Sequence, residues 1–367
     1  MRCSARLLSL PIVVTASISW AGEAPPDTLD IQPAEVRQLR SVPIAGRSGY
    51  FSWESAVCDE HGQVFLLPIS PRTGEGQEPS PPRDVLRISS DGKELKWFDP
   101  TSAHEFADAD EVTTIALTLD TRGDLVTLIW ARWIREGGEF GEKGGQYIVS
   151  FDDDGPHSHQ EVDWREMKVG QFAVFGSGDY LLRGLRLPAT RERLVILPRG
   201  AKEFRDIVGW PNYPAQWDDD PNRDVGRTFF SRHTVRGGDG QVYLTGLDPQ
   251  EDVVRVYSLD PSDGRTREAF RLEEMPHNYQ LLGLLSAGRR LAALYGEPPR
   301  PDAEQRRTRY WADVYANIGT YERQRVYGPL PRLPMCFEHS DTGGDRFTSI
   351  EVGQEGQHFL TTVSRKE

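Results

Sequence analysis

The chain has 367 residues, of which 37% are hydrophobic and 10% aromatic, so it holds enough apolar material for a core. Its 43 lysines and arginines stand against 56 aspartates and glutamates, which gives a net charge of −13. This excess of negative charge argues against nucleic acid and against anionic membrane surfaces as partners.

The N-terminus has the layout of a secretory signal peptide. Arg2 and Arg6 precede an apolar run over residues 7–18, and small residues around Ala21 and Ala24 offer a cleavage site. The run is too short to span a bilayer, and no later segment could cross one. We therefore expect residues 1–24 to be removed and residues 25–367 to form one exported domain, periplasmic or extracellular. The alternative is that the run is a buried first strand.

One sequence pattern occurs six times along the remaining chain: an expected turn that ends in glycine, followed by an apolar segment expected to form a strand. The clearest copy, residues 238–270, is a meander of β-prone segments separated by tight turns. Spacings of 48 to 68 residues between copies, with about four strands each, are typical of propeller blades. The glycines that mark the copies are Gly62, Gly123, Gly178, Gly240, Gly288 and Gly356.

The first copy shows the strand pattern of a blade. Its expected strands cover residues 53–59, 63–69, 84–89 and 93–98. The stretch WESAVCDEHGQVFLLP, followed by VLRISSDGKELKWF, resembles the NHL-type repeats of six-bladed β-propellers. The resemblance covers most of the chain after the signal peptide, and it implies a fold rather than an activity.

The two ends of the chain are expected to close the ring. The sixth copy keeps two strands, at 347–352 and 358–364, and two more are available near the start, at 28–31 and 36–42. Strands from both termini would then share one blade and leave no open sheet edge. The prediction is an all-β, six-bladed propeller in which N-terminal strands join the C-terminal blade.

Two cysteines, Cys58 and Cys336, remain after signal removal. In an exported protein such a pair invites a disulfide. The expected topology argues against one, because it places Cys58 at the bottom of an innermost strand and Cys336 in a connection at the top. A strand of about six residues spans roughly 20 Å, which is more than a disulfide can bridge. We expect two unpaired, mostly buried thiols.

The connections between strands are of two lengths. In a propeller, the links between first and second strands and between third and fourth strands share one face, and these links are tight. The links on the other face are long, which favours a binding face there, with loop decoration or oligomer contacts as the alternative. The long links are expected at 68–83, 100–111, 131–145, 209–230, 295–309 and 328–346.

The longest insertion combines aromatic rings and carboxylates. Trp210, Tyr213 and Trp217 stand beside an acidic run that begins at Asp218. Flat rings beside acids suit a sugar ring or a peptide segment. Two alternatives remain open: a self-packed surface loop, and a calcium site over residues 218–224, although that run lacks the EF-hand spacing.

Two histidines, His157 and His159, alternate in an expected hairpin turn after three aspartates. Alternate residues of a strand share a face, so the imidazoles could begin a metal site. An exposed, solvated turn is the alternative.

The enzyme hypothesis rests on a second resemblance. Residues 53–57 look like the opening of a gluconolactonase-type propeller, which implies a divalent metal held by carboxylates and amides atop the innermost strands. Eight residues before the marker glycines stand Glu54, Ile115, Gly170, Arg232, Gln280 and Thr348, with one carboxylate among them. The resemblance therefore fails at the positions that would hold the metal, and we expect neither metal nor cofactor.

The residues at and next to these innermost-strand positions predict a polar, partly cationic channel mouth. The residues expected to converge there are Glu54, Arg232, His233, Tyr279 and Gln280. We expect an exported, non-catalytic binding or protein-interaction module for a glycan, peptide or protein. Its expected ligand-binding residues are Trp210, Tyr213, Trp217, Asp218, Arg232, His233, Tyr279 and Gln280. The alternative is a hydrolase or lyase acting on a sugar-derived substrate, with Glu54 and His233 as acid and base.

Overall fold

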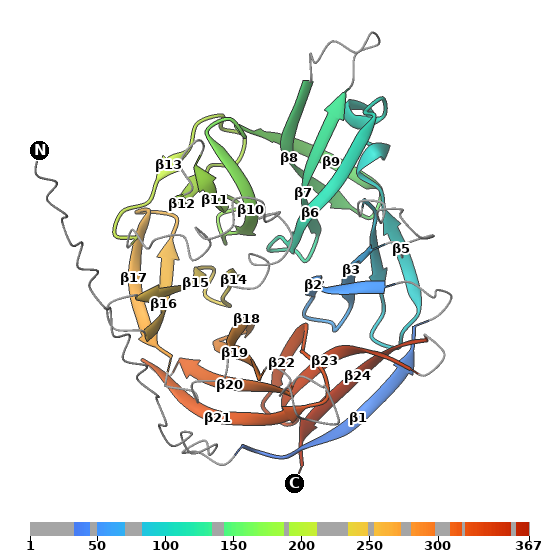
Figure 1. Ribbon diagram of the computed structural model, residues 1–367, viewed down its shortest axis with the longest axis vertical. Helices are drawn as coiled ribbons and strands as arrows, with labels where there is room; N and C mark the ends of the chain where they lie inside the picture. The colour runs from blue at the N-terminus through green and yellow to red at the C-terminus, as the bar shows by residue number, and fades with distance from the viewer. Residues whose placement is uncertain are drawn as a thin grey trace, which may run out of the picture.

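The structure is a computed structural model, and it describes residues 33–44, 50–69, 83–133, 143–186, 191–210, 234–248, 253–272, 280–297, 309–317, 320–353 and 357–366. These residues form six four-stranded antiparallel sheets around a common axis (Figure 1). The architecture is a six-bladed β-propeller, as the repeats predict. Among these residues, no helix combines the length and the apolar character needed to cross a membrane.

The first three blades each use four consecutive strands, counted from the axis outward. Blade 1 contains β2 (Tyr50–Cys58), β3 (Val64–Ile69), β4 (Val85–Ile88) and β5 (Glu94–Phe98). Two short 3-10 helices, η1 (Pro100–Ser102) and η2 (His104–Phe106), lead to blade 2, which contains β6 (Glu111–Leu119), β7 (Leu125–Trp133), β8 (Lys143–Asp152) and β9 (Gly155–Val162). Blade 3 contains β10 (Met167–Val174), β11 (Tyr180–Arg186), β12 (Arg191–Leu197) and β13 (Arg205–Asp206).

The remaining blades follow the same order until the last. Blade 4 contains β14 (Thr234–Arg236), β15 (Val242–Asp248), β16 (Val253–Asp260) and β17 (Arg265–Arg271). Blade 5 contains β18 (Gln280–Ala287), β19 (Arg290–Glu297), β20 (Arg309–Asn317) and β21 (Tyr321–Leu330). Blade 6 contains β22 (Cys336–Ser340), β23 (Gly344–Val352), β24 (His358–Arg365) and, outermost, β1 (Val36–Pro43).

Blade 6 closes the ring with strands from both ends of the chain. β1 pairs antiparallel with β24, from Val36 opposite Arg365 to Pro43 opposite Phe359. The predicted closure by the strand at residues 36–42 is confirmed. The second predicted strand, residues 28–31, lies outside the described residues.

The predicted marker glycine of the sixth repeat, Gly356, is wrong, and so is the order of strands counted from it. The turn between its first two strands ends at Gly344, which has φ +68°, and Gly356 belongs to the next connection. The sequence GQEG at 353–356 resembles the marker pattern, and a repeat aligned on Gly356 places β22 in an expected connection. Thr348 accordingly lies in the second strand, where its hydroxyl bonds Thr362 at 2.9 Å, and not at the channel.

Cys58 and Cys336 form a disulfide with a Cα–Cα distance of 5.6 Å, so the prediction of two free thiols is wrong. The error follows from the missed strand. Cys336 begins β22, which is the innermost strand of blade 6 and lies next to blade 1 in the ring (Figure 1). The disulfide therefore joins the last blade to the first at their innermost strands, whereas β1 completes the sheet of blade 6 at its outer edge.

The marker glycines of blades 1 to 4 end turns in which the last residue has a positive φ. In blade 1, Asp59 Oδ1 accepts the backbone N–H groups of His61 (2.9 Å) and Gln63 (2.8 Å), while Gly62 has φ +72°. Asp120 and Gly123 repeat this turn in blade 2. Glycine takes such a conformation at little steric cost, so this turn is readable from sequence.

The apolar core is divided among the junctions between blades. Each of six clusters packs side chains of one sheet against the facing side of its neighbour; Val126 and Leu128 of blade 2, for example, meet Phe172 and Leu182 of blade 3. Sheets buried on both faces need apolar residues on both sides of a strand, and residues 291–297 are buried throughout. A polar side chain in such a strand is therefore an exception that requires an explanation.

Gly184 of β11 is the position where we expect added volume to be least tolerated. A Cβ there would lie 2.1 Å from the carbonyl oxygen of Lys168, which is backbone and cannot rotate away. We expect Gly184→Ala to lower the free energy of unfolding by about 3 kcal/mol, as overpacking does. Gly123→Ala is the matched control, because a Cβ there meets nothing within 4 Å and only the φ of +85° opposes it. That control should lose about 1 kcal/mol. Equal losses in urea denaturation would contradict the crowding argument.

Candidate binding site

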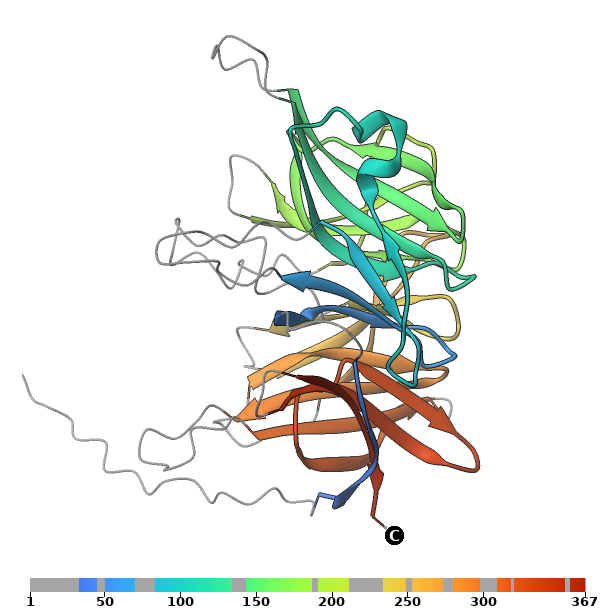
Figure 2. The ribbon, with the colours of Figure 1, turned by 90° about the vertical axis from the view of Figure 1, so that its right-hand side faces the viewer.

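The two faces of the ring differ in the length of their connections. Because strand direction alternates, first–second and third–fourth links share one face, which we call the turn face, and all other links share the opposite, long-link face. Figure 2 views the ring edge-on and separates the two. The turn-face links include 59–63, 89–93, 120–124 and 175–179, whereas the long-link face receives 70–84, 99–110, 134–142, 207–233 and 298–308.

One of the expected long links is wrong. Residues 328–346 contain the end of β21 and all of β22, so the connection between blades 5 and 6 shrinks to residues 331–335. The remaining long links emerge on a single face, as the repeat pattern predicts.

A cavity of about 780 Å³ lies on the axis and is lined by residues from all six blades. Its wall is formed by the turn-face ends of the innermost strands and includes the disulfide cysteines together with Phe172, Thr234 and Arg236. The cavity therefore opens toward the short turns, below the level of the long links.

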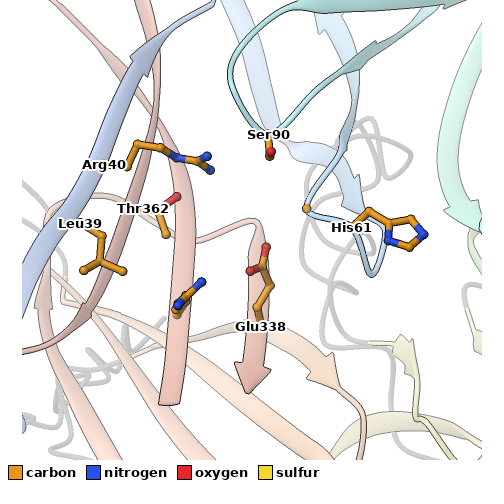
Figure 3. Close-up of a pocket in the computed structure, with 8 residues that line it drawn as sticks. Leu39, Arg40, His61, Ser90, Glu338 and Thr362 are labelled. Carbon is orange, nitrogen blue, oxygen red and sulfur yellow. The ribbon is translucent and has the colours of Figure 1, made fainter. Parts of the chain in front are cut away.

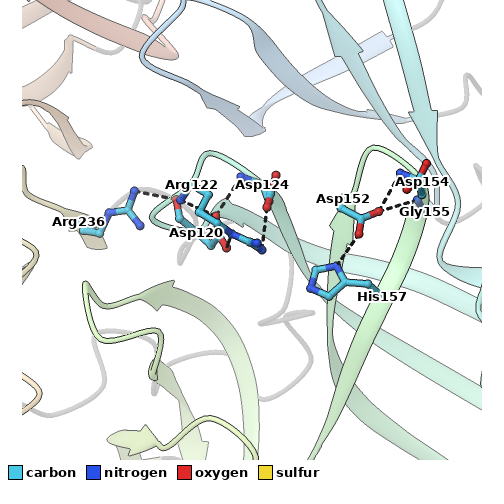
Figure 4. A network of polar contacts seen from close by, with 8 residues as sticks. All are labelled: Asp120, Arg122, Asp124, Asp152, Asp154, Gly155, His157 and Arg236. Atoms are coloured by element: carbon cyan, nitrogen blue, oxygen red, sulfur yellow. Dashed lines mark hydrogen bonds and ion pairs between the residues drawn. The ribbon is translucent and has the colours of Figure 1, made fainter.

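Arg236, one of the cations of this wall, is held by hydrogen bonds to the backbone of another blade. Its guanidinium reaches from blade 4 to blade 2 and donates to the carbonyl oxygens of Leu119 (3.3 Å) and Asp120 (2.9 Å), beside the Asp120–Asp124 turn (Figure 4). Burial lowers the pKa of Arg236, and attraction to Asp120 opposes that effect. The side chain braces the turn across the axis.

The histidine pair of the predicted hairpin belongs to two separate contacts. His157 Nδ1 lies 3.7 Å from Asp152, whose carboxylate accepts the N–H groups of Asp154 and Gly155 (Figure 4). These bonds, led by the one from Asp154, lower the pKa of Asp152. His159 Nδ1 instead lies 3.7 Å from Glu105. Within the described ranges, no three His, Cys, Asp or Glu side chains gather in a group that could hold a metal ion.

A second pocket, of about 380 Å³, lies on the turn face where blade 6 meets blade 1 (Figure 3). Arg40 of β1 and Glu338 of β22 line it together with His61 and Ser90, which belong to two turns of blade 1. Both signs of charge are present, and β1 contributes Leu39 and Arg40 to the lining.

Of the ligand-binding residues expected from the sequence, Trp210 alone has a described side chain. Gln280 begins β18 and Glu54 lies in β2, so both occupy innermost strands as predicted. The others fall outside the described residues: Tyr213, Trp217, Asp218, Arg232, His233 and Tyr279.

Trp210 lies half-buried at the junction of blades 3 and 4. After β13 the chain leaves blade 3, and Val208 forms a bridge with Arg265 of blade 4. The indole then packs edge-on against Tyr257 of β16, with ring centroids 5.3 Å apart. The guanidinium of Arg183, from β11, lies 5.7 Å from the indole centroid, within cation–π range. Trp210 is thus anchored in the junction, at the start of the long link in which the sequence predicts it.

Four buried polar residues share this junction with Trp210, and sequence reasoning missed all four. We call them the polar junction: Gln171, Arg183, Thr234 and Arg255, with 2%, 7%, 9% and 9% of their surface exposed. The available signal was the appearance of Gln171 and Arg183 inside otherwise apolar strands, QFAVF and LLRGL. The polar junction is thus one of the places in the described chain where buried polar side chains interrupt the apolar core.

No protein family matches the chain, and no curated protein matches it. The NHL-type resemblance therefore stays a prediction.

Several solved structures share the fold. A virginiamycin B lyase from Staphylococcus aureus, with quinupristin, is 10% identical over 90% of this chain and 100% of that chain, with a TM-score of 0.43. The endosialidase of phage phi92 is 8% identical over 89% and 69%, with a TM-score of 0.48. The soluble aldose sugar dehydrogenase from Escherichia coli is 11% identical over 90% and 99%, with a TM-score of 0.41. Likeness at this level concerns the propeller fold and carries no argument about activity.

Proposed function

We propose that the chain is an exported, non-catalytic binding module that receives a glycan or peptide on its long-link face, at the junction of blades 3 and 4. The observation that carries the proposal is Trp210, held half-buried between two blades with Arg183 against its ring. Because Arg183 and Tyr257 hold the indole, it offers a rigid stacking surface at low entropic cost. The buried polar groups beside it supply the hydrogen bonds that orient a ligand.

Export is supported by the disulfide. Bonds between cysteines persist in oxidising compartments and are rare in a reducing cytosol. The apolar N-terminal run with its arginines adds to this support, although residues 1–32 lie outside the described part of the chain.

Trp210→Ala tests the proposal. The purified protein is applied to glycan and peptide arrays, and each ligand found is titrated against wild type and variant. We expect the substitution to weaken binding at least tenfold, because it removes the ring that faces the ligand and releases Arg183 from it. Circular dichroism checks that the variant is folded.

Trp97→Ala is the matched control, since Trp97 is also half-buried but lies in the outer strand of blade 1. It should reduce stability and leave affinity unchanged. If both variants bind like wild type, or weaken binding equally, the ligand does not use the blade 3–4 junction.

A further inference from the structure

Gln171 is almost completely buried, with 2% of its surface exposed, yet neither its amide nitrogen nor its amide oxygen has a hydrogen-bond partner. Folded proteins match nearly all buried polar groups, because an unmatched one loses its bonds to water without replacement. Such an exception calls for a specific explanation, such as a bound molecule.

Gln146 shows what a structural glutamine looks like in the same chain. It lies in β8 of blade 2 with 1% of its surface exposed. Its Nε2 donates to the carbonyl oxygen of Val169 at 2.8 Å, and its Oε1 accepts the N–H of the same residue at 2.9 Å. Gln146 therefore bridges two blades, with both its amide nitrogen and its amide oxygen hydrogen-bonded. Neither amide atom of Gln171 is hydrogen-bonded.

Thr234 is the second unmatched group, because its hydroxyl is buried without a partner. Strand alternation places it on the same junction as Gln171. Gln171 shares a side of β10 with Ala173, which packs between blades 3 and 4. Thr234 is paired with Leu244, which packs in the same cluster. Two unmatched groups from adjacent innermost strands thus face one junction.

Arg183 adds a positive charge to that junction. It is the cross-strand partner of Gln171, so the two side chains leave the sheet on the same side. Arg255, on the facing side of blade 4, forms an ion pair with Glu268 at 2.5 Å. Among the described residues, the junction therefore brings together the guanidinium groups of Arg183 and Arg255, the carboxylate of Glu268 that pairs with Arg255, an amide and a hydroxyl.

We propose that the polar junction binds the carboxylate of a small hydroxylated acid, such as a sugar acid. The guanidinium of Arg183 recognises the carboxylate, while the amide of Gln171 and the hydroxyl of Thr234 bond the neighbouring hydroxyl groups. The indole of Trp210 covers the sugar from the long-link side. This inference rests on the proposed function and names its ligand class.

Gln171→Met provides the sharpest test, because methionine keeps the shape and removes both unmatched atoms. Isothermal titration uses D-glucuronate as the probe, with neutral D-glucose for comparison. We expect wild type to bind D-glucuronate and not D-glucose, and Gln171→Met to bind D-glucuronate at least tenfold more weakly. Without ligand, the variant should melt at the wild-type temperature or about 2 °C above it, since no bond is lost.

Gln146→Met is the matched control. It removes two made bonds and should lower the melting temperature, by about 4 °C or more, without changing affinity for D-glucuronate. Thr234→Val is the second probe of the site, and it should weaken D-glucuronate binding several-fold while the fold is kept.

Three results overturn the inference: D-glucuronate fails to bind wild type, Gln171→Met binds it as wild type does, or Gln171→Met melts as low as Gln146→Met. The last result would mean that ordered water already satisfies the amide. The proposed function is tested separately. An array ligand that depends on Trp210 but carries no carboxylate would support the proposed function and refute the acid specificity.

Discussion

Cys58→Ser is expected to lower the free energy of unfolding by about 4 kcal/mol. The bond links residues 278 positions apart, so in the oxidised protein it removes a large part of the freedom of the unfolded chain. In the folded state it also holds blade 6 to blade 1. Their junction would otherwise rely on the β1–β24 pairing and one apolar cluster.

Urea denaturation of wild type, Cys58→Ser, Cys336→Ser and the double variant measures this effect. The three variants should lose the same free energy, because each lacks the same bond. Dithiothreitol should bring wild type to their level and leave them unchanged. An unchanged midpoint for reduced wild type would show that β1 alone closes the ring.

Arg323→Leu is expected to destabilise the protein by about 3–5 kcal/mol, since it leaves a carboxylate buried beside an apolar side chain. Asp313 of β20 is fully buried. Its carboxylate accepts the Nε of Arg323 at 2.8 and 2.9 Å and the hydroxyl of Tyr315 at 2.9 Å. Removing the guanidinium therefore withdraws the charge that this carboxylate faces across β20 and β21.

Two further variants separate burial from charge pairing. Arg122→Leu breaks the pair between Arg122 and Asp124, which are 2.8 Å apart but whose side chains are 62% and 31% exposed. It should cost less than about 1 kcal/mol. Replacing Asp313 and Arg323 together by leucine should recover most of the loss, because the two charges that pair with each other are removed together. Thermal unfolding in parallel measures all three, and equal losses for the two single variants would contradict the argument.

The blades could be predicted from sequence because their turns are local. The turn that ends at Gly62 needs a positive φ at one position and an aspartate three residues earlier, and both are visible in the sequence. The four strands of blade 1 lie within three residues of their predicted bounds. The closing strand β1 was also predicted, at residues 36–42, although a register shift between Gln38 and Arg40 interrupts its pairing with β24.

The last blade could not be read correctly. β22 has five residues, CFEHS, with little apolar periodicity, and it is held by pairing with β23. Missing it displaced Cys336 from the ring and led to the wrong prediction for the thiols. A short innermost strand depends on its neighbours, and local propensity does not report them.

The polar junction could not be predicted from the sequence either, because it also depends on contacts between neighbouring blades. Gln171 and Thr234 come from different blades, and what distinguishes Gln171 from Gln146 is the presence or absence of a partner, which no sequence pattern reports. The aromatic surroundings of Trp210 predict a ligand-binding role for it, but its anchoring against Arg183 and Tyr257 depends on how two blades face each other.

A crystal structure of the wild-type protein soaked with D-glucuronate tests the central claim most directly. The account predicts density for one molecule between blades 3 and 4, with its carboxylate about 3 Å from the Arg183 guanidinium and the Gln171 amide bonded to a sugar hydroxyl. Density confined to the axial cavity near Arg236, or a junction that holds water alone at saturating D-glucuronate, would contradict it.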